Sequence, residues 1–374
     1  MTVIAIDALG IGQPGGGRSA TINLLRELLR LDTANHYLLL LDQPEPELAA
    51  LGTHVEQVLV PTHHRLLSRA WGQLTWPFSL RGRKVSLVHH IKNLTLLGLP
   101  GRSVVTIYDL AIVLHPEMFP AVDVFYWRHV QPRLLRAVDR IIAISRQTAS
   151  DITQLYGLPA ENIEVIYPAY GPRFRPATDE EKERVRRRYQ TGPRFILHVG
   201  SISRKKNLLT LLLAFEELCR RGYEGRLLLV GRQYPKGYDE AFYAHLGSSP
   251  HRGRILLPGP VPDEDLPALY SAAELMIFPS LHEGFGIVPL EAMACGTPVI
   301  TSNSGALPEV VGGGATILGN PTDAAAWAEA AERLLSDAAL RAERISRGLQ
   351  WVKRYSATEA ARQTLAVYSG LETC

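Results

Sequence analysis

Short hydrophobic runs alternate with amphipathic stretches along most of the chain. Strand-like apolar runs fall at 3–6, 37–41, 55–60, 85–90, 104–108, 140–145 and 162–167, and again at 195–199, 226–230, 254–257, 275–278, 298–301 and 315–318. Between them lie stretches whose apolar residues recur every three or four positions, such as 18–31, 122–138 and 208–221. From position 323 onward the pattern is helical. Repeated strand–helix units of this kind predict an α/β fold with parallel sheets.

The length and a charge run predict two domains. A chain of 374 residues exceeds what one ordinary hydrophobic core holds. A run of charged residues over 179–189, preceded by three prolines, separates the two series of strands. We therefore expect an N-terminal domain over 1–170, a linker over 171–192 and a second domain over 193–352. A C-terminal helix over 353–374 is expected to pack back on the N-terminal domain. The architecture predicted is two Rossmann-like domains facing each other across a cleft.

Composition narrows the class of protein. Hydrophobic residues make up 46%, which is typical of a globular enzyme, and 40 Lys and Arg against 37 Asp and Glu give a net charge of only +3, too small to argue for nucleic acid. The cysteines Cys219, Cys295 and Cys374 lie far apart, without disulfide or metal-ligand spacing. A strand pattern follows Met1 directly, which argues against a signal peptide. No run approaches the ~20 apolar residues of a membrane span. We expect a cytoplasmic protein.

A glycine-rich loop follows the first predicted strand. It contains Gly10, Gly12, Gly15, Gly16 and Gly17 and leads into the stretch 18–31. The spacing matches neither a dinucleotide fingerprint nor a P-loop, which disfavours an NAD-dependent oxidoreductase. The loop is either a permissive strand–helix junction or a place where backbone amides face a phosphate or an acceptor, and three consecutive glycines favour the second interpretation.

Polar residues follow two later strands of the first half. His89 and His90 end one strand, and the next strand ends in Tyr108-Asp109. The carboxyl ends of strands are where open α/β sheets bind ligands, so these four residues are candidates for a site, although a lone histidine is more often structural.

The segment 63–84 interleaves basic and aromatic residues. Either it contacts a membrane surface or an anionic acceptor, or it is an amphipathic helix whose Leu/Trp face packs on the sheet; the second interpretation is slightly favoured.

Two segments of the second half carry charge suited to a nucleotide sugar. Arg204, Lys205 and Lys206 stand between a strand and a helix, where cations and exposed amides together bind a diphosphate, although a basic surface turn is the common alternative. Glu283 and Glu291 stand eight positions apart, separated by a Gly-Phe-Gly turn. Carboxylates accept hydrogen bonds from sugar hydroxyls and stabilise developing positive charge, so this segment predicts a nucleotide-sugar site.

These motifs together resemble the retaining GT-B glycosyltransferases of family 4, in the mannosyltransferase-like branch of polysaccharide assembly. The resemblance covers essentially the whole chain and is most specific over 195–320. It rests on Pro279-Ser280-x-x-Glu283-Gly-Phe-Gly, the Glu-x7-Glu pair, Glu291-Ala-Met-Ala-Cys-Gly-Thr-Pro-Val, Leu307-Pro308-Glu309-Val310, Val199-Gly200, Lys206-Asn207 and the N-terminal glycine loop.

The resemblance implies roles for matching positions. Glu283 and Lys206 would be catalytic, with Tyr108 and Asp109 from the other domain. Glu291 would hold the ribose hydroxyls. The remaining donor-binding residues would be Gly16, Gly17, Gly200, Ser201, Lys205, Arg232, Val261, Gly284, Phe285, Gly286 and Ile287. No metal and no cofactor is implied, because cations and helix termini bind the diphosphate. Two positions depart from the family: Ser201 replaces a common arginine, and Tyr108 replaces a common histidine.

The expected function is therefore a retaining hexosyltransferase. It would move a hexosyl group from a nucleotide diphosphate sugar (GDP-mannose or a UDP-hexose) to a hydroxyl of a glycan, lipid-linked or small-molecule acceptor. Alternatives are another GT-B enzyme, such as a nucleotide-sugar epimerase or a disaccharide phosphorylase, and an inactive protein that binds sugar nucleotides. No nucleic-acid partner is expected, and the N-terminal domain is the candidate for peripheral contact with the inner face of the membrane.

Overall fold

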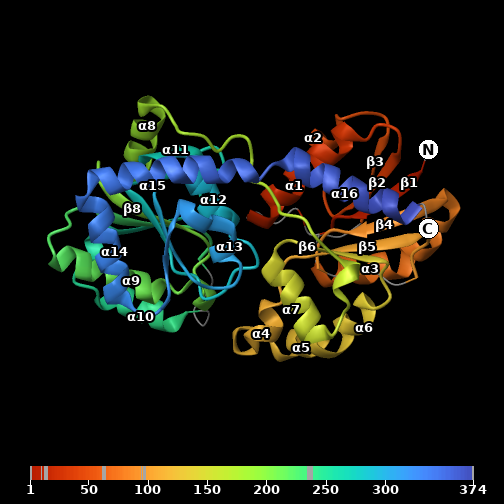
Figure 1. The fold of residues 1–374 in the computed structure, drawn as a ribbon, viewed down its shortest axis with the longest axis horizontal. Helices are drawn as coiled ribbons and strands as arrows, with labels where there is room; N and C mark the ends of the chain where they lie inside the picture. Colours follow the sequence, from red (N-terminus) through yellow and green to blue (C-terminus); the bar gives the residue numbers. More distant parts are fainter. Residues whose placement is uncertain are drawn as a thin grey trace. The chain divides into compact units, whose positions relative to one another are not determined.

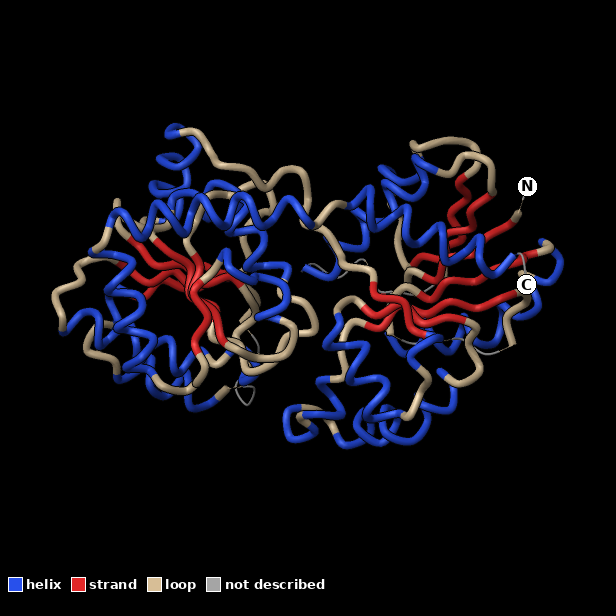
Figure 2. The backbone as a smooth tube through the Cα atoms, viewed as in Figure 1, coloured by secondary structure: helices blue, strands red, loops and turns tan. Residues whose placement is uncertain are grey.

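The computed structural model describes residues 2–9, 11, 16–60, 65–93, 95, 98–233 and 239–372. They form two compact units (Figure 1): unit 1 comprises Met1–Gly171 and Tyr355–Cys374, and unit 2 comprises Pro172–Arg354. Each unit is a parallel sheet flanked by helices (Figure 2), which confirms the predicted α/β fold with Rossmann-like units.

Within these residues, unit 1 contains a seven-stranded parallel sheet of order β3-β2-β1-β4-β5-β6-β7. Its strands are β1 (Val3–Asp7), β2 (His36–Leu41), β3 (Val55–Leu59), β4 (Val85–His90), β5 (Arg102–Ile107), β6 (Arg140–Ala143) and β7 (Ile163–Val165). Its helices are α1 (Gly16–Leu31), α2 (Pro46–Ala49), α3 (Arg65–Ser79), α4 (Ala111–Leu114), α5 (Ala121–Phe125), α6 (Gln131–Leu135), α7 (Arg146–Tyr156) and α16 (Ala357–Glu372).

Helix α16 is part of unit 1 although it comes from the far end of the chain. Ala361 and Tyr368 are buried in one cluster with Ile4, Ile6 and Leu25, which belong to β1 and α1. Another cluster of unit 1 contains Trp76 of α3, so the Leu/Trp face of the segment 63–84 packs on the sheet, as the slightly favoured interpretation predicted. Residues 61–64 lie outside the described residues, and the side chains of 65–70 are likewise not described.

The stretch 122–138, predicted as one helix, is interrupted. Helix α5 passes into a π-helical turn over Tyr126–Val130 before α6 begins at Gln131. Pro132 has no amide hydrogen, and its ring crowds the carbonyl four residues earlier. A π turn relieves this conflict by widening the helix just before the proline.

Unit 2 contains, within its described residues, a six-stranded parallel sheet of order β10-β9-β8-β11-β12-β13. Its strands are β8 (Phe195–Val199), β9 (Arg226–Val230), β10 (Ile255–Gly259), β11 (Leu275–Phe278), β12 (Val299–Ser302) and β13 (Thr316–Leu318). Its helices are α8 (Asp179–Tyr189), α9 (Leu208–Arg220), α10 (Glu240–Ser248), α11 (Leu266–Ala272), α12 (Ile287–Ala294), α13 (Leu307–Val311), α14 (Ala324–Ser336) and α15 (Ala338–Trp351).

The charge run that suggested a linker forms helix α8 of unit 2. Thr178 caps its start, and the Thr178 side chain and Glu181 make a capping box. Its basic face is bound to α11, because the buried Asp265 accepts a hydrogen bond from Tyr189 and pairs with Arg184 and Arg188 at 2.9–3.1 Å.

Both sheets have a point at which the strand order changes direction. In unit 1 this point lies between β1 and β4, and in unit 2 it lies between β8 and β11. The loops that leave such neighbouring strands turn to opposite sides and open a crevice at the carboxyl edge of the sheet. The residues just after β8 and β11, and those at the ends of β1 and β4, are therefore the first places to look for a site.

Candidate functional site

An ion pair joins the two loops at the switch point of unit 2. Lys206 follows β8, Glu283 follows β11, and the Lys206 Nζ lies 2.5 Å from the Glu283 Oε1. The side chains are only 14% and 13% exposed. The ammonium group also lies 4.5 Å from the centre of the Phe278 ring, within the range of a cation–π contact. Two of the residues predicted to be catalytic are thus in direct contact.

Glu283 is charged in this setting. Burial by itself raises the pKa of its carboxyl, but the charges of Lys206 and Lys205 outweigh burial and lower the pKa to about 2. The carboxylate is therefore ionised at neutral pH, and it can accept hydrogen bonds or stabilise positive charge nearby.

Asn207 fixes the backbone that carries the two lysines, a role that the sequence did not reveal. It has a φ of +53° and ends the short 3-10 turn Arg204–Lys206. Its side-chain amide donates to the carbonyls of Pro279 (3.1 Å) and Pro321 (2.6 Å). The Leu281 amide in turn donates to the Lys205 carbonyl at 2.8 Å. The basic turn is thus attached to the loop that carries Glu283.

The glycine turn after Glu283 leads directly into helix α12. Gly286 has a φ of +103° and precedes the first helical residue, Ile287. A second glycine, Gly305, packs against this turn with a φ of +58°; a Cβ there would lie 2.3 Å from the Glu283 carbonyl oxygen. The first-turn amides of a helix lack partners within the helix and favour an anion. The turn Gly284–Gly286 therefore places the start of helix α12, whose first amides favour an anion, directly after Glu283.

Glu291 lies inside α12, one turn after its first residue, Ile287. It is 4% exposed, and the Tyr270 hydroxyl of α11 donates to its Oε2 at 3.0 Å. Burial raises the pKa of the Glu291 carboxyl to about 8, although the Tyr270 hydrogen bond and Arg173 lower it in part. The two acids of the Glu-x7-Glu pair therefore have opposite protonation at neutral pH.

A buried histidine lies beneath the ion pair. His198 of β8 stacks on Phe278, with ring centres 5.6 Å apart, and its Nδ1 donates to the Ile277 carbonyl at 3.0 Å. Burial lowers the pKa of His198 to about 4, so the ring is neutral. It supports the aromatic face on which Lys206 lies.

The other predicted donor residues lie along the same edge of the sheet. Gly200 and Ser201 follow β8; the Gly200 amide donates to the Val230 carbonyl, and the Ile202 amide donates to the Arg232 carbonyl at 3.0 Å. The Arg232 side chain is exposed, and Val261, which follows β10, is half-buried.

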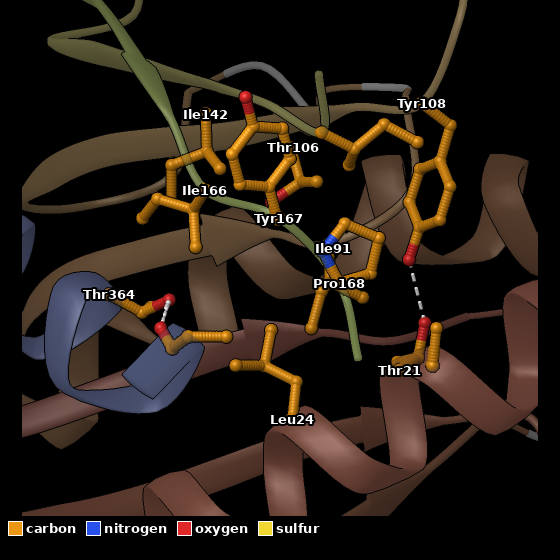
Figure 3. A pocket seen from close by; sticks show the side chains of 13 residues that line it. Thr21, Leu24, Ile91, Thr106, Tyr108, Ile142, Ile166, Tyr167, Pro168 and Thr364 are labelled. Carbon is orange, nitrogen blue, oxygen red and sulfur yellow. Dashed lines mark hydrogen bonds between the residues drawn. The ribbon is translucent and has the colours of Figure 1, made fainter. Parts of the chain in front are cut away.

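Two of the predicted residues of unit 1, Tyr108 and Gly17, are linked through Thr21 of helix α1. The Tyr108 hydroxyl lies 2.7 Å from the Thr21 Oγ1 (Figure 3), and the Thr21 hydroxyl donates to the Gly17 carbonyl at 2.8 Å. Since Thr21 uses its hydrogen on Gly17, Tyr108 is the donor to Thr21. Burial raises the pKa of Tyr108, so the phenol keeps its proton.

The structure also describes Asp109 and Gly16, two further predicted residues of unit 1. The Asp109 Oδ1 accepts from the Ala111 amide at 3.2 Å. Gly16 opens α1. Gly10, Gly12 and Gly15 lie outside the described residues.

A small cavity lies beside Tyr108. Its volume is about 30 Å³, room for about two water molecules and too little for a sugar ring. Ile91, Thr106 and Ile166 line it from the sheet side, and Leu24 and Thr364 line it from α1 and α16 (Figure 3). The lining is mainly apolar, so the cavity is a packing gap under Tyr108 rather than a substrate pocket.

Among the described residues, no group of three or more His, Cys, Asp or Glu side chains is placed so that it could hold a metal ion.

Comparison with known families matches both units. Residues 179–351 match the family described as "Glycosyl transferases group 1", and residues 14–172 match the family described as "Glycosyltransferase Family 4".

The chain is also similar to individual proteins, one by sequence and two by structure. The O-antigen chain mannosyltransferase B of Escherichia coli is 33% identical over 285 residues, which cover 75% of this chain and 74% of the relative. Sucrose-phosphate synthase from Thermosynechococcus elongatus superposes with a TM-score of 0.81 at 21% identity, over the full length of both chains. Anabaena HepE in complex with UDP and glucose superposes with a TM-score of 0.79 at 19% identity, over 99% of this chain and all of HepE. At such identities the two structures show a shared fold.

Proposed function

The chain belongs to the group 1 glycosyltransferases of family 4, and from this premise we propose that it is a retaining, metal-independent hexosyltransferase. Its donor would be a nucleotide diphosphate sugar, GDP-mannose or a UDP-hexose, and its acceptor a hydroxyl of a glycan, a lipid-linked glycan or a small molecule. The observation that carries the proposal is the buried Lys206–Glu283 pair beside the start of α12. The mannosyltransferase relative supports mannose as the hexose.

The diphosphate would bind where positive charge and helix amides converge. Lys206 and Lys205 supply the cations, and the first turn of α12 supplies amides from Ile287 onward. A diphosphate would compete with Glu283 for Lys206, because one ammonium group serves both anions. The Glu283 carboxylate would then face the sugar, where it accepts hydroxyl hydrogen bonds and stabilises the positive charge that develops at the anomeric carbon.

The nucleoside would bind further along the same edge. Glu291 would accept the ribose hydroxyls, and the backbone of Gly200, Ser201, Arg232 and Val261 would surround the base. Ribose hydroxyls that donate to Glu291 favour its ionised form, so they oppose the burial that raises its pKa to about 8.

Transfer would proceed on one face of the sugar. The bond from the anomeric carbon to the diphosphate breaks while the acceptor oxygen bonds to the same face, and the acceptor proton passes to a leaving phosphate oxygen. The positioned charges of Lys206, Lys205 and Glu283 would supply most of the rate enhancement.

A contact with the membrane surface is proposed for helix α3. Leu74 and Phe78 are 71% and 73% exposed on one helix face, and Arg81, Arg83 and Lys84 follow. Trp76 is buried, so it cannot take part. Within the described ranges, none of the helices has the length and apolar character needed to cross a bilayer. A cytoplasmic protein that binds the inner face of the membrane through α3 fits this surface. Flotation with anionic liposomes should recover the wild type and lose a Leu74→Ser/Phe78→Ser variant.

Incubation with a panel of UDP-, GDP- and ADP-sugars, with and without acceptor, tests the proposal. One donor should raise the melting temperature and, with acceptor, give a product whose anomeric configuration by NMR equals that of the donor. An inverted product would overturn retention. A free epimer or a sugar phosphate would instead support the alternative GT-B activities, and donor binding without transfer would support the inactive binding protein.

A further inference from the structure

A buried Asp–His pair occupies the switch point of unit 1. Asp7 ends β1 and His90 ends β4, and the two residues are direct partners in the parallel register. The His90 Nδ1 lies 3.1 Å from the Asp7 Oδ2, and the side chains are 2% and 1% exposed. The other Asp7 oxygen, Oδ1, accepts from the Leu9 amide at 3.2 Å. The carboxylate is thus fixed by the backbone and in turn fixes the imidazole.

This place in unit 1 is topologically equivalent to the Lys206–Glu283 site of unit 2. In both sheets the pair bridges the two strands at which the strand order reverses, β1 and β4 in one case and β8 and β11 in the other. Ligands of open α/β sheets bind outside the carboxyl ends of these strands. A buried polar pair at this point is therefore well placed to meet a ligand.

The two adjacent histidines of β4 differ in what their nitrogens do. His89 uses both: its Nδ1 lies 2.6 Å from the Tyr368 hydroxyl and its Nε2 lies 2.8 Å from the Thr106 hydroxyl. His90 points to the opposite side of the sheet, since successive strand residues alternate. Its Nδ1 donates to Asp7, and Nε2 has no hydrogen-bond partner in the part of the chain that the structure describes. In the tautomer that carries its hydrogen on Nδ1, the lone pair is on Nε2.

The segment that follows His90 is held in place. Asn93 has a φ of +57°, its amide donates to the Thr106 carbonyl at 2.9 Å, and its side-chain oxygen accepts from the Tyr108 amide at 2.6 Å. These hydrogen bonds link the segment after β4 to the end of β5. His90 is the last residue of β4, so hydrogen bonds hold the backbone on both sides of it.

We propose that His90 is an acceptor-binding residue: its Nε2 accepts a hydrogen bond from a hydroxyl of the acceptor sugar or alcohol, and Asp7 is the positioning residue that orients the ring. The inference rests on the proposed glycosyl transfer, and it assigns to unit 1 a specific contact with the acceptor.

The test separates acceptor use from donor use. For His90→Gln and His90→Phe, we measure transfer to acceptor, donor hydrolysis to water and nucleotide binding. The expected result is a fall of about tenfold or more in kcat/KM for the acceptor, mainly through KM, with donor hydrolysis and nucleotide affinity unchanged. His89→Gln is the matched control: it removes a neighbouring buried imidazole and should lower the melting temperature without an acceptor-specific loss.

Asp7→Asn tests the orienting role. Because the Leu9 amide occupies one side-chain oxygen, the new amide nitrogen faces the His90 Nδ1 and donates to it. The ring hydrogen then moves to Nε2, which no longer accepts. The acceptor KM should rise as in His90→Phe, while nucleotide affinity stays unchanged.

If the variants do not fold, the role of His90 can still be tested on the wild type. With ¹⁵N-labelled histidine, addition of acceptor should shift one Nε2 resonance of the 12 histidines. Transfer by the wild type, together with an unchanged acceptor KM in the His90 variants or with no shift, would overturn the role of His90 and leave the proposed function standing. Absence of transfer by the wild type with every donor and acceptor would overturn both.

Discussion

Lys206 and Glu283 hold each other across the switch point of unit 2, with the Lys206 Nζ 2.5 Å from the Glu283 Oε1. The two residues are 77 positions apart and belong to loops that leave different strands. The charge of Lys206 lowers the pKa of the Glu283 carboxyl, so a change in one residue alters the electrostatics of the other. The first two predictions follow from this relationship.

Lys206→Ala should lower kcat by about 10²–10³-fold, because it removes a cation from the proposed diphosphate site. It should also raise the pKa of Glu283, since the charge of Lys206 lowers it. Steady-state transfer kinetics check the first effect. Lys182→Ala is the control. Lys182 pairs with the exposed Asp179 on α8, and neither residue belongs to the proposed site. Its loss should leave kcat unchanged. Equal turnover in wild type and Lys206→Ala would contradict the assignment.

Glu283→Gln should alter how stability depends on acid. The folded-state pKa of Glu283 is about 2, below its ordinary value of 4.5, so its contribution is present above pH 4.5 and is lost as the pH falls through 2. Urea unfolding at pH 7 should therefore show a wild-type advantage on the order of 3 kcal/mol at most, which shrinks towards pH 3. An advantage that does not change with pH would show that the ion pair has no such effect.

Glu291→Gln should abolish a proton release on nucleotide binding. The pKa of Glu291 is about 8, so the carboxyl is largely protonated at pH 7, and ribose hydroxyls that donate to it favour the ionised form. Nucleotide affinity of the wild type should thus rise with pH up to about 8. Calorimetry in two buffers of different ionisation enthalpy measures the released proton. Identical proton release by wild type and variant would exclude Glu291 as its source.

The Glu291 carboxyl makes stability depend on pH in the opposite direction to Glu283. Because its folded-state pKa is raised, the stability linked to Glu291 is fully present below pH 4.5 and is lost as the pH rises through 8. Relative to Glu291→Gln, the wild type should therefore be less stable at pH 9 than at pH 6. Thermal melts of both proteins across this range give the comparison; parallel curves would be the contrary result.

Gly305→Ala should damage the site without altering any functional side chain. The added Cβ would lie 2.3 Å from the Glu283 carbonyl oxygen, and the φ of +58° is unfavourable for alanine. We expect a loss of at least about 1 kcal/mol in the free energy of unfolding and a lower kcat as the Glu283 turn shifts. Gly247→Ala in α10 is the control, because nothing lies within 4 Å of its Cβ position and no positive φ is involved. Similar behaviour of the two variants would contradict the prediction.

The strands of both sheets could be predicted from the sequence because their apolar runs are short and clearly bounded. The interrupted helix around Pro132 was missed, since helical periodicity continues through a π turn. The proposed donor residues could be named from the sequence because Glu283, Lys206 and the glycine turn belong to local motifs. Partners from distant segments were not: nothing in the sequence links Tyr270 to Glu291 or Thr21 to Tyr108. Asp7 and His90 lie 83 positions apart, and only the strand order of the sheet, which hydrophobic pattern does not encode, makes them neighbours.

Helix α16 has a consequence for the order in which the protein is completed during translation. Unit 2 is one continuous segment, Pro172–Arg354, whereas the core of unit 1 includes Ala361 and Tyr368 of α16. The ribosome therefore makes most of unit 1 first, yet that unit has its full core only after unit 2 has been synthesised. During this interval the nascent unit 1 lacks the α16 part of the cluster that also contains Ile4, Ile6 and Leu25, and incompletely buried apolar surface of this kind favours aggregation. A stop codon after unit 2 would leave unit 2 whole and unit 1, which was made first, without α16.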